Sequence, residues 1–172
     1  MGCMNETACN YNSEANMADG TCEFADEGYD CEGNITAEIG DVLEGGYLFY
    51  IDESGDRGLI MGTEDLGEMN WFEAIESVEN YSVFDYSNWY LPTIDQMQMN
   101  IQIDLLLFDL ESNFYWSISE YSDGAFTYNF SIPLVGDANL ISSQHVRPFR
   151  AFGNWTMGCM DETACNYNSE AN

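Results

Sequence analysis

The sequence predicts a mixed α+β domain joined to a small, disulfide-rich, loop-dominated module, with the pair repeated in tandem every 156 residues. Residues 1–36 contain four cysteines but no apolar periodicity, which is typical of a small cross-linked module. Residues 37–153 contain apolar patterns of both the helical and the strand period, which indicates an α+β domain. Residues 154–172 start the module again, so the next repeat is expected to begin there.

The tandem repeat is inferred from a duplicated segment. Residues 1–16 and 157–172 are identical, except that Asn5 in the first copy corresponds to Asp161 in the second. Met1 therefore corresponds to an internal methionine, and we expect the chain to be part of a longer array. The alternative is a single domain flanked by two copies of a short motif.

The charge of the chain argues against two classes of partner. It has 31 aspartates and glutamates, three arginines and no lysine, and its net charge is −28. Such a chain repels nucleic acid phosphates and anionic membranes, so neither nucleic acid nor direct membrane contact is expected. With 45% hydrophobic and 15% aromatic residues it has enough apolar surface for one folded core.

The clustered cysteines predict disulfide bonds and an oxidising, extracellular compartment. They are Cys3, Cys9, Cys22, Cys31, Cys159 and Cys165. The last two correspond to the first two, so they lack partners within this chain if the first two pair with later cysteines. Zinc is the alternative, but the spacing C-x5-C-x12-C-x8-C is not that of common zinc fingers, and no histidine is nearby. Four cysteines allow three pairings, which the sequence leaves open.

Acidic side chains around the later cysteines of the module form a candidate calcium site, since calcium prefers several carboxylate and carbonyl oxygens. The candidates are Asp19, Asp26, Glu27, Asp30 and Glu32. The alternative is a solvated acidic loop, which the absence of a D-x-D-x-D-G sequence favours. No other cofactor is expected.

The second domain is predicted to begin with a β-hairpin. Residues 46–51 and 58–61 are apolar runs, and the intervening residues are typical of a turn. Asp52, Ser54 and Asp56 also imitate part of a calcium loop, but a turn is the simpler interpretation.

Two helices are predicted next. In the first, Asn70 is a suitable N-cap for a helical face. This face contains Trp71, Ala74, Ile75 and Val78. A second helix is predicted over residues 94–110, after Pro92, with Thr93 and Gln96 as a capping box. Its inward face would contain Met97, Ile101, Asp104, Leu105 and Phe108.

The last part of the domain is predicted to be strands. Residues 115–119, 126–130 and 145–152 combine aromatic and β-branched side chains, and Asp123-Gly124 is a turn signal. The predicted order of elements is therefore hairpin, two helices and further strands, as expected for an α+β domain.

The first module resembles a known cysteine-rich repeat. Residues 2–34 read GCMNETACNYNSEANMADGTCEFADEGYDCEGN. This segment is similar to the repeat GCTDPTACNYNPEATxDDGSC, often followed by EEGYDCDGN, which lies between domains of large secreted bacterial proteins. The resemblance implies a secreted, multi-copy spacer without a chemistry of its own.

The second domain carries another resemblance, in five segments. In order they are GGYLFYIDESGDRGLI, NWFEAIESV, WYLPTIDQM, YWSISEYS and VRPFRAF. They resemble the Lcl C-terminal-like domain family, whose pattern is GGxIFYVDExGxxGL, W-EA, WRLPTxxEL, YWSSTEY and VRxVRxF. The match spans about residues 44–152. It implies a C-type-lectin-like mixed domain of secreted and cell-surface proteins, some of which bind sulfated polysaccharides.

The residues that match the family are expected to frame the core rather than bind a ligand. They include Trp71, Trp89, Pro92, Trp116, Arg147 and Arg150. Tyr90 stands where the family has arginine, and the strongly acidic chain suits a polyanionic glycan poorly. Glycosaminoglycan binding is therefore not carried over from the family.

No catalytic constellation is apparent, and an enzyme is not expected. His145 is the only histidine, and no nucleophile partner is evident in the sequence. Five N-x-[ST] sequons are candidate glycosylation sites if the source glycosylates its secreted proteins. They are at Asn5, Asn34, Asn80, Asn129 and Asn154.

These observations together indicate a structural role outside the cell. We expect a repeat unit of an extracellular filament, fibre or surface stalk, whose partners are neighbouring copies of itself. Two alternatives remain: a carbohydrate-binding adhesin, for which glycans are the partner, and a viral or phage fibre domain.

Overall fold

The computed structural model describes residues 1–99 and 106–153. The chain divides into two compact units, one covering Met1–Glu38 and the other beginning at Ile39. The division is close to the change of composition after residue 36. Within the described ranges, no helix combines the length and the apolar character that crossing a bilayer requires.

The first unit is built from turns and isolated β-bridges. The bridges pair Gly2 with Ala18, Cys3 with Tyr11, and Tyr29 with Ile35. Among its apolar side chains only Cys3 and Ala8 are buried. A unit with so little buried apolar surface depends on its cross-links for order.

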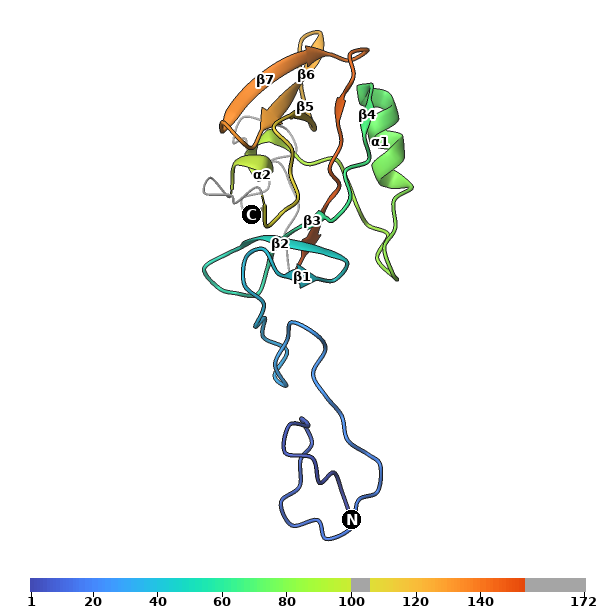
Figure 1. Cartoon of the computed structure of the whole chain (residues 1–172), viewed down its shortest axis with the longest axis vertical. Coiled ribbons are helices and arrows are strands. Elements are labelled where there is room, and N and C mark those ends of the chain that lie inside the picture. Colours follow the sequence, from blue (N-terminus) through green and yellow to red (C-terminus); the bar gives the residue numbers. More distant parts are fainter. Residues whose placement is uncertain (100–105, 154–172) are drawn as a thin grey trace, which may run out of the picture. The chain divides into compact units, whose positions relative to one another are not determined.

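The second unit contains helices and two β-sheets, mostly strand, and is therefore α+β as predicted (Figure 1). The first sheet consists of β1 (Val42–Leu43), β2 (Gly46–Ile51), β3 (Gly58–Gly62) and β9 (Phe149–Phe152), in the order β1-β2-β3-β9. All its pairs are antiparallel, and β2 and β3 form the predicted hairpin. Gly58 is required there, because an added β-carbon would lie 2.0 Å from the carbonyl oxygen of Tyr50.

The second sheet has five strands in the order β4-β8-β5-β6-β7. They are β4 (Glu68–Met69), β5 (Phe114–Tyr121), β6 (Gly124–Asn129), β7 (Leu134–Asn139) and β8 (Gln144–His145). The β5–β8 pair is parallel and the others are antiparallel. The predicted strands over residues 115–119 and 126–130 correspond to β5 and β6.

The predicted single strand over residues 145–152 is wrong, because this segment contributes to both sheets. β8 pairs with β4 and β5, whereas β9 pairs with β3. Pro148 lies between them, and proline cannot donate a hydrogen bond to a continuing ladder. The strand β7 was not predicted, because its sequence LVGDAN has no regular alternation.

The first helix follows the prediction. α1 (Trp71–Glu79) begins after Asn70, whose side-chain oxygen accepts hydrogen bonds from the backbone N–H groups of Phe72 and Glu73, both at 3.1 Å. The Glu73 carboxylate accepts the backbone N–H of Asn70 at 3.1 Å, which completes a capping box.

The second helix is shorter than predicted. α2 (Ile94–Gln98) begins at the predicted Thr93 cap with Gln96 opposite it, but it ends at Gln98 rather than near residue 110. Phe108 lies in a turn and is nevertheless buried. Its apolar side chain therefore reaches the core without a helix. Residues 100–105, which include the predicted face residues Ile101, Asp104 and Leu105, lie outside the described ranges.

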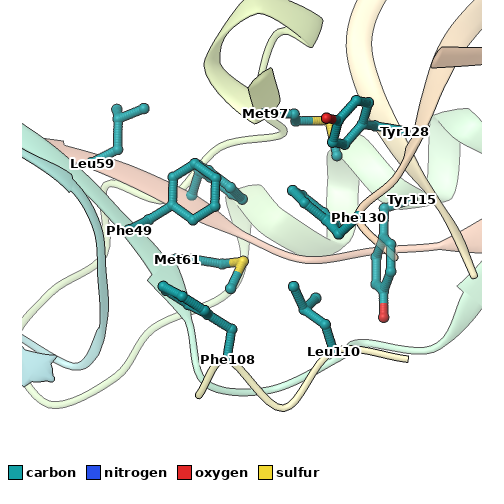
Figure 2. Close-up of a cluster of buried hydrophobic side chains, with 10 residues drawn as sticks. Phe49, Leu59, Met61, Met97, Phe108, Leu110, Tyr115, Tyr128 and Phe130 are labelled. Carbon is teal, nitrogen blue, oxygen red and sulfur yellow. The ribbon is translucent and has the colours of Figure 1, made fainter. Parts of the chain in front are cut away.

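One apolar cluster joins the two sheets (Figure 2). It contains Phe49, Leu59, Met61, Met97, Phe108, Leu110, Tyr115, Tyr128, Phe130 and Phe149. Phe49 on β2 lies at its centre, with edge-on ring contacts to three phenylalanines at centroid distances of 4.9 to 6.1 Å. Each buried ring contributes about 1.5–3 kcal/mol, so this cluster fixes the sheets relative to each other.

A second apolar cluster packs α1 against the five-stranded sheet. It contains Trp71, Ala74, Val78, Leu91, Trp116, Ala125 and Val146. Three of these residues lie on the helical face predicted from the sequence, which is therefore confirmed as buried.

Candidate functional site

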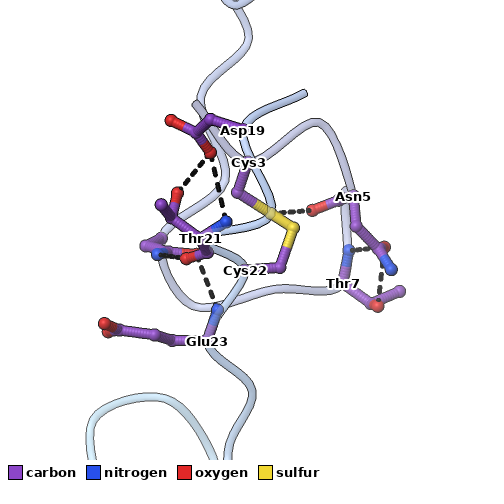
Figure 3. Close-up of a disulfide and its surroundings, with 8 residues drawn as sticks. Cys3, Asn5, Thr7, Asp19, Thr21, Cys22 and Glu23 are labelled. Atoms are coloured by element: carbon purple, nitrogen blue, oxygen red, sulfur yellow. Dashed lines mark hydrogen bonds between the residues drawn. A yellow bond between two sulfur atoms is a disulfide. The ribbon is translucent and has the colours of Figure 1, made fainter. Parts of the chain in front are cut away.

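Two disulfide bonds close the first unit, and Figure 3 shows the one between Cys3 and Cys22. They join Cys3 to Cys22 and Cys9 to Cys31, over separations of 19 and 22 residues. The prediction of disulfides is thereby confirmed for these four cysteines, and one of the three pairings is selected. The two loops overlap, so each bond constrains a segment that the other also closes. Cys159 and Cys165 lie outside the described residues.

Polar contacts join residues 9–10 to residues 21–23 beside the Cys3–Cys22 disulfide. Cys9 donates its backbone N–H to the carbonyl oxygen of Glu23 at 2.8 Å. The Asn10 amide donates to the carbonyl oxygen of Thr21 at 2.5 Å and accepts the backbone N–H of Glu23 at 3.0 Å. The Asp19 carboxylate accepts the hydroxyl of Thr21 at 2.6 Å and its N–H at 3.1 Å. The unit is thus shaped by cross-links and turn hydrogen bonds.

The candidate calcium ligands act as turn caps where their contacts are described. Asp30 accepts the backbone N–H groups of Glu32 and Asn34, at 3.0 and 2.8 Å, and the side-chain amide of Asn34 at 2.8 Å. The hydrogen bond from the Asn34 side chain is the main reason that the pKa of Asp30 lies below its usual value. The hydroxyl of Thr21 lowers the pKa of Asp19 in the same way.

These acidic residues are not gathered into a metal site. The five candidates were Asp19, Asp26, Glu27, Asp30 and Glu32. In the described part of the chain, no three histidine, cysteine or carboxylate side chains are grouped as a metal ion would require.

The loop between β2 and β3 forms a turn, which was the preferred interpretation of its sequence. One oxygen of Asp52 accepts the hydroxyl and the N–H of Ser54, at 2.6 and 3.1 Å. The other accepts the guanidinium of Arg57 at 2.5 Å. The Ser54 hydroxyl and then Arg57 hold the pKa of Asp52 below its ordinary value. Both oxygens of the carboxylate thus take part in closing the hairpin.

Arg147 is a buried framing residue, as the family resemblance predicts. It is 1% exposed. Its guanidinium donates to the carbonyl oxygens of Gly62 and Thr63, at 3.2 and 2.7 Å, and to that of Asp109. It therefore ties the end of β3 to the loop before β5. Its Nε is buried and has no hydrogen-bond partner among the described atoms.

Arg150 is the second framing arginine. It is 4% exposed and forms an ion pair with Glu44, whose carbonyl oxygen it also contacts at 3.3 Å. Its guanidinium lies over the ring of Tyr86, 4.3 Å from the centroid, and 5.6 Å from the ring of Trp89. Burial with an acid and two aromatic faces indicates a structural role for this cation.

The predicted tryptophan and proline residues also frame the core. The indole N–H groups of Trp71 and Trp116 donate to the carbonyl oxygens of Ser117 and Met69, each at 2.9 Å. Trp89 donates to Tyr86 at 3.1 Å, and the carbonyl of buried Pro92 accepts the N–H of Ile118 at 2.8 Å. The contacts of Trp71 and Pro92 connect α1 and the loop that follows it to β5 of the five-stranded sheet, while the contact of Trp89 closes that loop on itself.

His145 is the centre of a polar cluster that the sequence did not indicate. Its Nδ1 lies 2.9 Å from Asp65, and its Nε2 lies 2.9 Å from the Asn113 amide and 3.6 Å from Glu68. Asp65 and Asn113 are 80 and 32 residues away in the chain, so no local pattern could reveal them. Both ring nitrogens have polar contacts, which hold the imidazole on β8 against the segment before β4 and the start of β5.

The phenol of Tyr115 lies beside this cluster. The ring of Tyr115 lies 5.5 Å from the imidazole. Burial raises the pKa of Tyr115 to about 12. The phenol therefore stays protonated at neutral pH.

The described sequons differ in accessibility. Asn5, Asn34 and Asn80 are exposed, but Asn129 is only 4% exposed. Its side-chain oxygen accepts the N–H and hydroxyl of Ser131, at 2.9 and 2.6 Å. The folded domain therefore encloses the side chain of Asn129, unlike those of the other three described sequons. Asn154 lies outside the described residues.

The described side chains thus form a cross-linked acidic module and a domain framed by buried arginines and tryptophans. No protein-family model and no curated protein matches this chain.

Proposed function

We propose that this chain is a repeat unit of an extracellular filament, fibre or surface stalk, in which domains follow one another head to tail. The observation that carries the proposal is the duplicated cysteine segment, considered with the disulfide pairing of its first copy. The disulfides and the lack of a membrane-spanning helix among the described residues are compatible with an extracellular location.

The disulfide pairing of the first copy can be transferred to the second copy as part of the proposal. Cys3 and Cys9 pair with cysteines that lie 19 and 22 residues later in the chain. Cys159 and Cys165 occupy the same positions in the second copy. With the same separations, their partners would lie beyond Asn172. No disulfide would then join one repeat to the next, and the cysteines of each module would pair within that module.

The cross-linking of the first unit is suited to a spacer between domains. It buries little apolar surface, yet two overlapping cross-links restrain it within 38 residues. Each bond is worth about 3 kcal/mol on the chain-entropy model for loops of this length. Such a link resists extension under load better than an uncrosslinked acidic loop, which suits a stalk or filament.

A C-type-lectin-like fold for the second unit is part of the proposal. Its support is the mixed α+β architecture together with the burial of Trp116, Arg147 and Arg150, which the family resemblance assigned to the core. In this function the domain acts as a folded body between spacers, and neighbouring copies are its partners.

The test is a disulfide map of a chain in which residues 1–156 are repeated twice. Peptide mass spectrometry should find Cys159 bonded to the cysteine 19 residues later and Cys165 to the one 22 residues later. A bond between Cys159 and Cys165, or between the two modules, would contradict the proposal. In electron micrographs, contour length should grow in equal steps with added repeats, whereas globular particles would count against a filament.

A glycan array separates this proposal from the carbohydrate-binding adhesin. The adhesin alternative predicts that the chain retains a defined sugar class, and that binding is lost when an exposed aromatic side chain is removed. The filament proposal predicts no such selectivity.

A further inference from the structure

The two disulfide bonds of the first unit differ in exposure. Cys3 is 2% exposed and Cys22 is half-buried. The sulfur of Cys3 also lies 3.8 Å from the carbonyl oxygen of Asn5, so the chain covers it (Figure 3). Cys9 and Cys31, in contrast, are both exposed. The Cys9–Cys31 bond is therefore the one that a reagent in solution can reach.

A disulfide bond is opened by a thiolate that attacks one of its two sulfurs. The S–S bond breaks, a new S–S bond joins the attacking sulfur to one cysteine, and the other cysteine leaves as a thiolate that takes a proton from water. A second thiol then displaces the first one, which leaves two free cysteines and one molecule of oxidised thiol. Because the rate depends on access to the sulfur, the exposed bond should react before the enclosed one.

Opening the exposed bond also removes the protection of the other one. Among the apolar side chains of the unit only Cys3 and Ala8 are buried, so little else keeps the unit closed. On the chain-entropy model, losing the cross-link between Cys9 and Cys31 raises the population of the open unit roughly a hundredfold. The Cys3–Cys22 bond then becomes accessible, so the two bonds should open in a fixed order.

The charge around the exposed bond selects the thiol that can attack it. Asp30 and Glu32 are the neighbours of Cys31 in the chain. The backbone N–H of Cys9 donates to the carbonyl oxygen of Glu23 at 2.8 Å, so a third acidic residue lies beside the bond. The first unit contains nine acidic residues and no lysine or arginine. An anionic thiol is therefore repelled, whereas a thiol that carries an ammonium group is attracted.

We propose that Cys9–Cys31 is a thiol–disulfide exchange site, at which small cationic thiols open the first unit. Residues 39–153 contain no cysteine, so the exchange acts on the first unit and leaves the second one folded. The reaction takes place within one module, so it does not depend on the head-to-tail linkage of repeats.

Timed reduction tests the order in which the bonds open. The 172-residue chain carries Cys159→Ser and Cys165→Ser, so that only the four paired cysteines remain. Dithiothreitol is added, and samples are alkylated and mapped by peptide mass spectrometry. Chains that have lost one bond should be labelled at Cys9 and Cys31, whereas in urea both bonds should open at similar rates. Label on the other pair, or equal label on both pairs without urea, would overturn the proposal.

Two matched variants test whether one bond protects the other. In Cys9→Ala/Cys31→Ala the remaining bond should be reduced faster, by up to roughly a hundredfold, because the unit opens more often. In Cys3→Ala/Cys22→Ala the remaining bond is already exposed, so its rate should change little. Equal acceleration in both variants would contradict the proposed order.

The choice of thiol is tested with cysteamine, which is cationic, and 3-mercaptopropionate, which is anionic. Their rates per thiolate are divided by those on the neutral disulfide of 2-mercaptoethanol. In about 0.1 M NaCl cysteamine should react at least about fivefold faster, as expected for unit charges at contact in water. Raising NaCl to about 1 M shortens the Debye length from roughly 10 to 3 Å, so the ratio should fall towards one. A ratio of one at the lower salt concentration would overturn the preference for cationic thiols. None of these results bears on the disulfide map of the tandem chain, which is made without added thiol.

Discussion

Removing one cross-link should unfold the first unit and leave the second folded. In the double variant Cys9→Ala/Cys31→Ala, a loop closed over 22 residues is opened. On the chain-entropy model this change lowers the free energy of unfolding of the unit by about 3 kcal/mol, or roughly a hundredfold in the equilibrium constant. The unit has almost no buried apolar surface to compensate, because only Cys3 and Ala8 among its apolar side chains are buried.

Hydrogen exchange with mass spectrometry measures this effect unit by unit. Two backbone hydrogen bonds report on the first unit: Cys9 N–H to Glu23 at 2.8 Å and Asn12 N–H to Cys3 at 2.9 Å. Their amides should exchange roughly a hundredfold faster in the double variant, while those of β2 and β3 should keep the wild-type rate. Met4→Ala is the matched control, because it alters an exposed side chain of the same unit without opening a cross-link.

The result that would refute this reasoning is continued protection of the residue 9 amide without the disulfide. Such protection would mean that the remaining Cys3–Cys22 bond and turn hydrogen bonds, such as those of Asn10 and Asp19, hold the unit without the second cross-link. A simultaneous loss of protection in β2 and β3 would also refute it, since the two units would then unfold together.

Three further predictions concern single interactions. Arg150→Met should lower the free energy of unfolding of the second unit by about 2–3 kcal/mol, because it removes the buried guanidinium that pairs with the partly buried Glu44 carboxylate; adding Glu44→Gln, which removes the negative charge, should restore part of this in urea denaturation. Asn70→Ala should cost about 1 kcal/mol through loss of the α1 cap, again measured in urea. The depressed pKa of Asp52 means that this carboxylate stabilises the fold above its unfolded pKa, and that the contribution is lost as the pH falls through the folded pKa. Arg57→Gln should raise that pKa in an NMR titration, and an unchanged titration would show that the Ser54 hydroxyl alone depresses it.

Helix caps and turns could be predicted from the sequence where both hydrogen-bonding groups lie close together in the chain. The caps at Asn70 and Thr93 and the hairpin turn at Asp52 each depend on side chains within five positions. The burial of Trp116 and Arg147 was expected from the family resemblance. For the caps and the turn, the hydrogen-bond partner lies within a few residues, so a short segment of sequence contains both groups. For Trp116 and Arg147, the expectation came from their match to the family pattern.

Backbone conformation was harder to predict than burial where the only signal was the spacing of apolar residues. Met97 and Phe108 are both buried, as their spacing indicated, but only Met97 lies on a helix. Apolar spacing predicts which side chains leave water, and a turn can bury a phenylalanine as well as a helix can. β7 shows the opposite case, because a segment without alternation becomes a strand through its pairing with β6.

The sequence by itself determined the duplication, the strong negative charge, the need for cross-links in the first module and the mixed character of the second. Only the tertiary structure decided which cysteines pair, which carboxylate and amide hold His145, that Asn129 is enclosed and that β7 is left as an edge. The physical reason is distance along the chain. Composition and short-range pattern act through the residue and its neighbours, whereas these features arise between segments that meet only when the chain has folded.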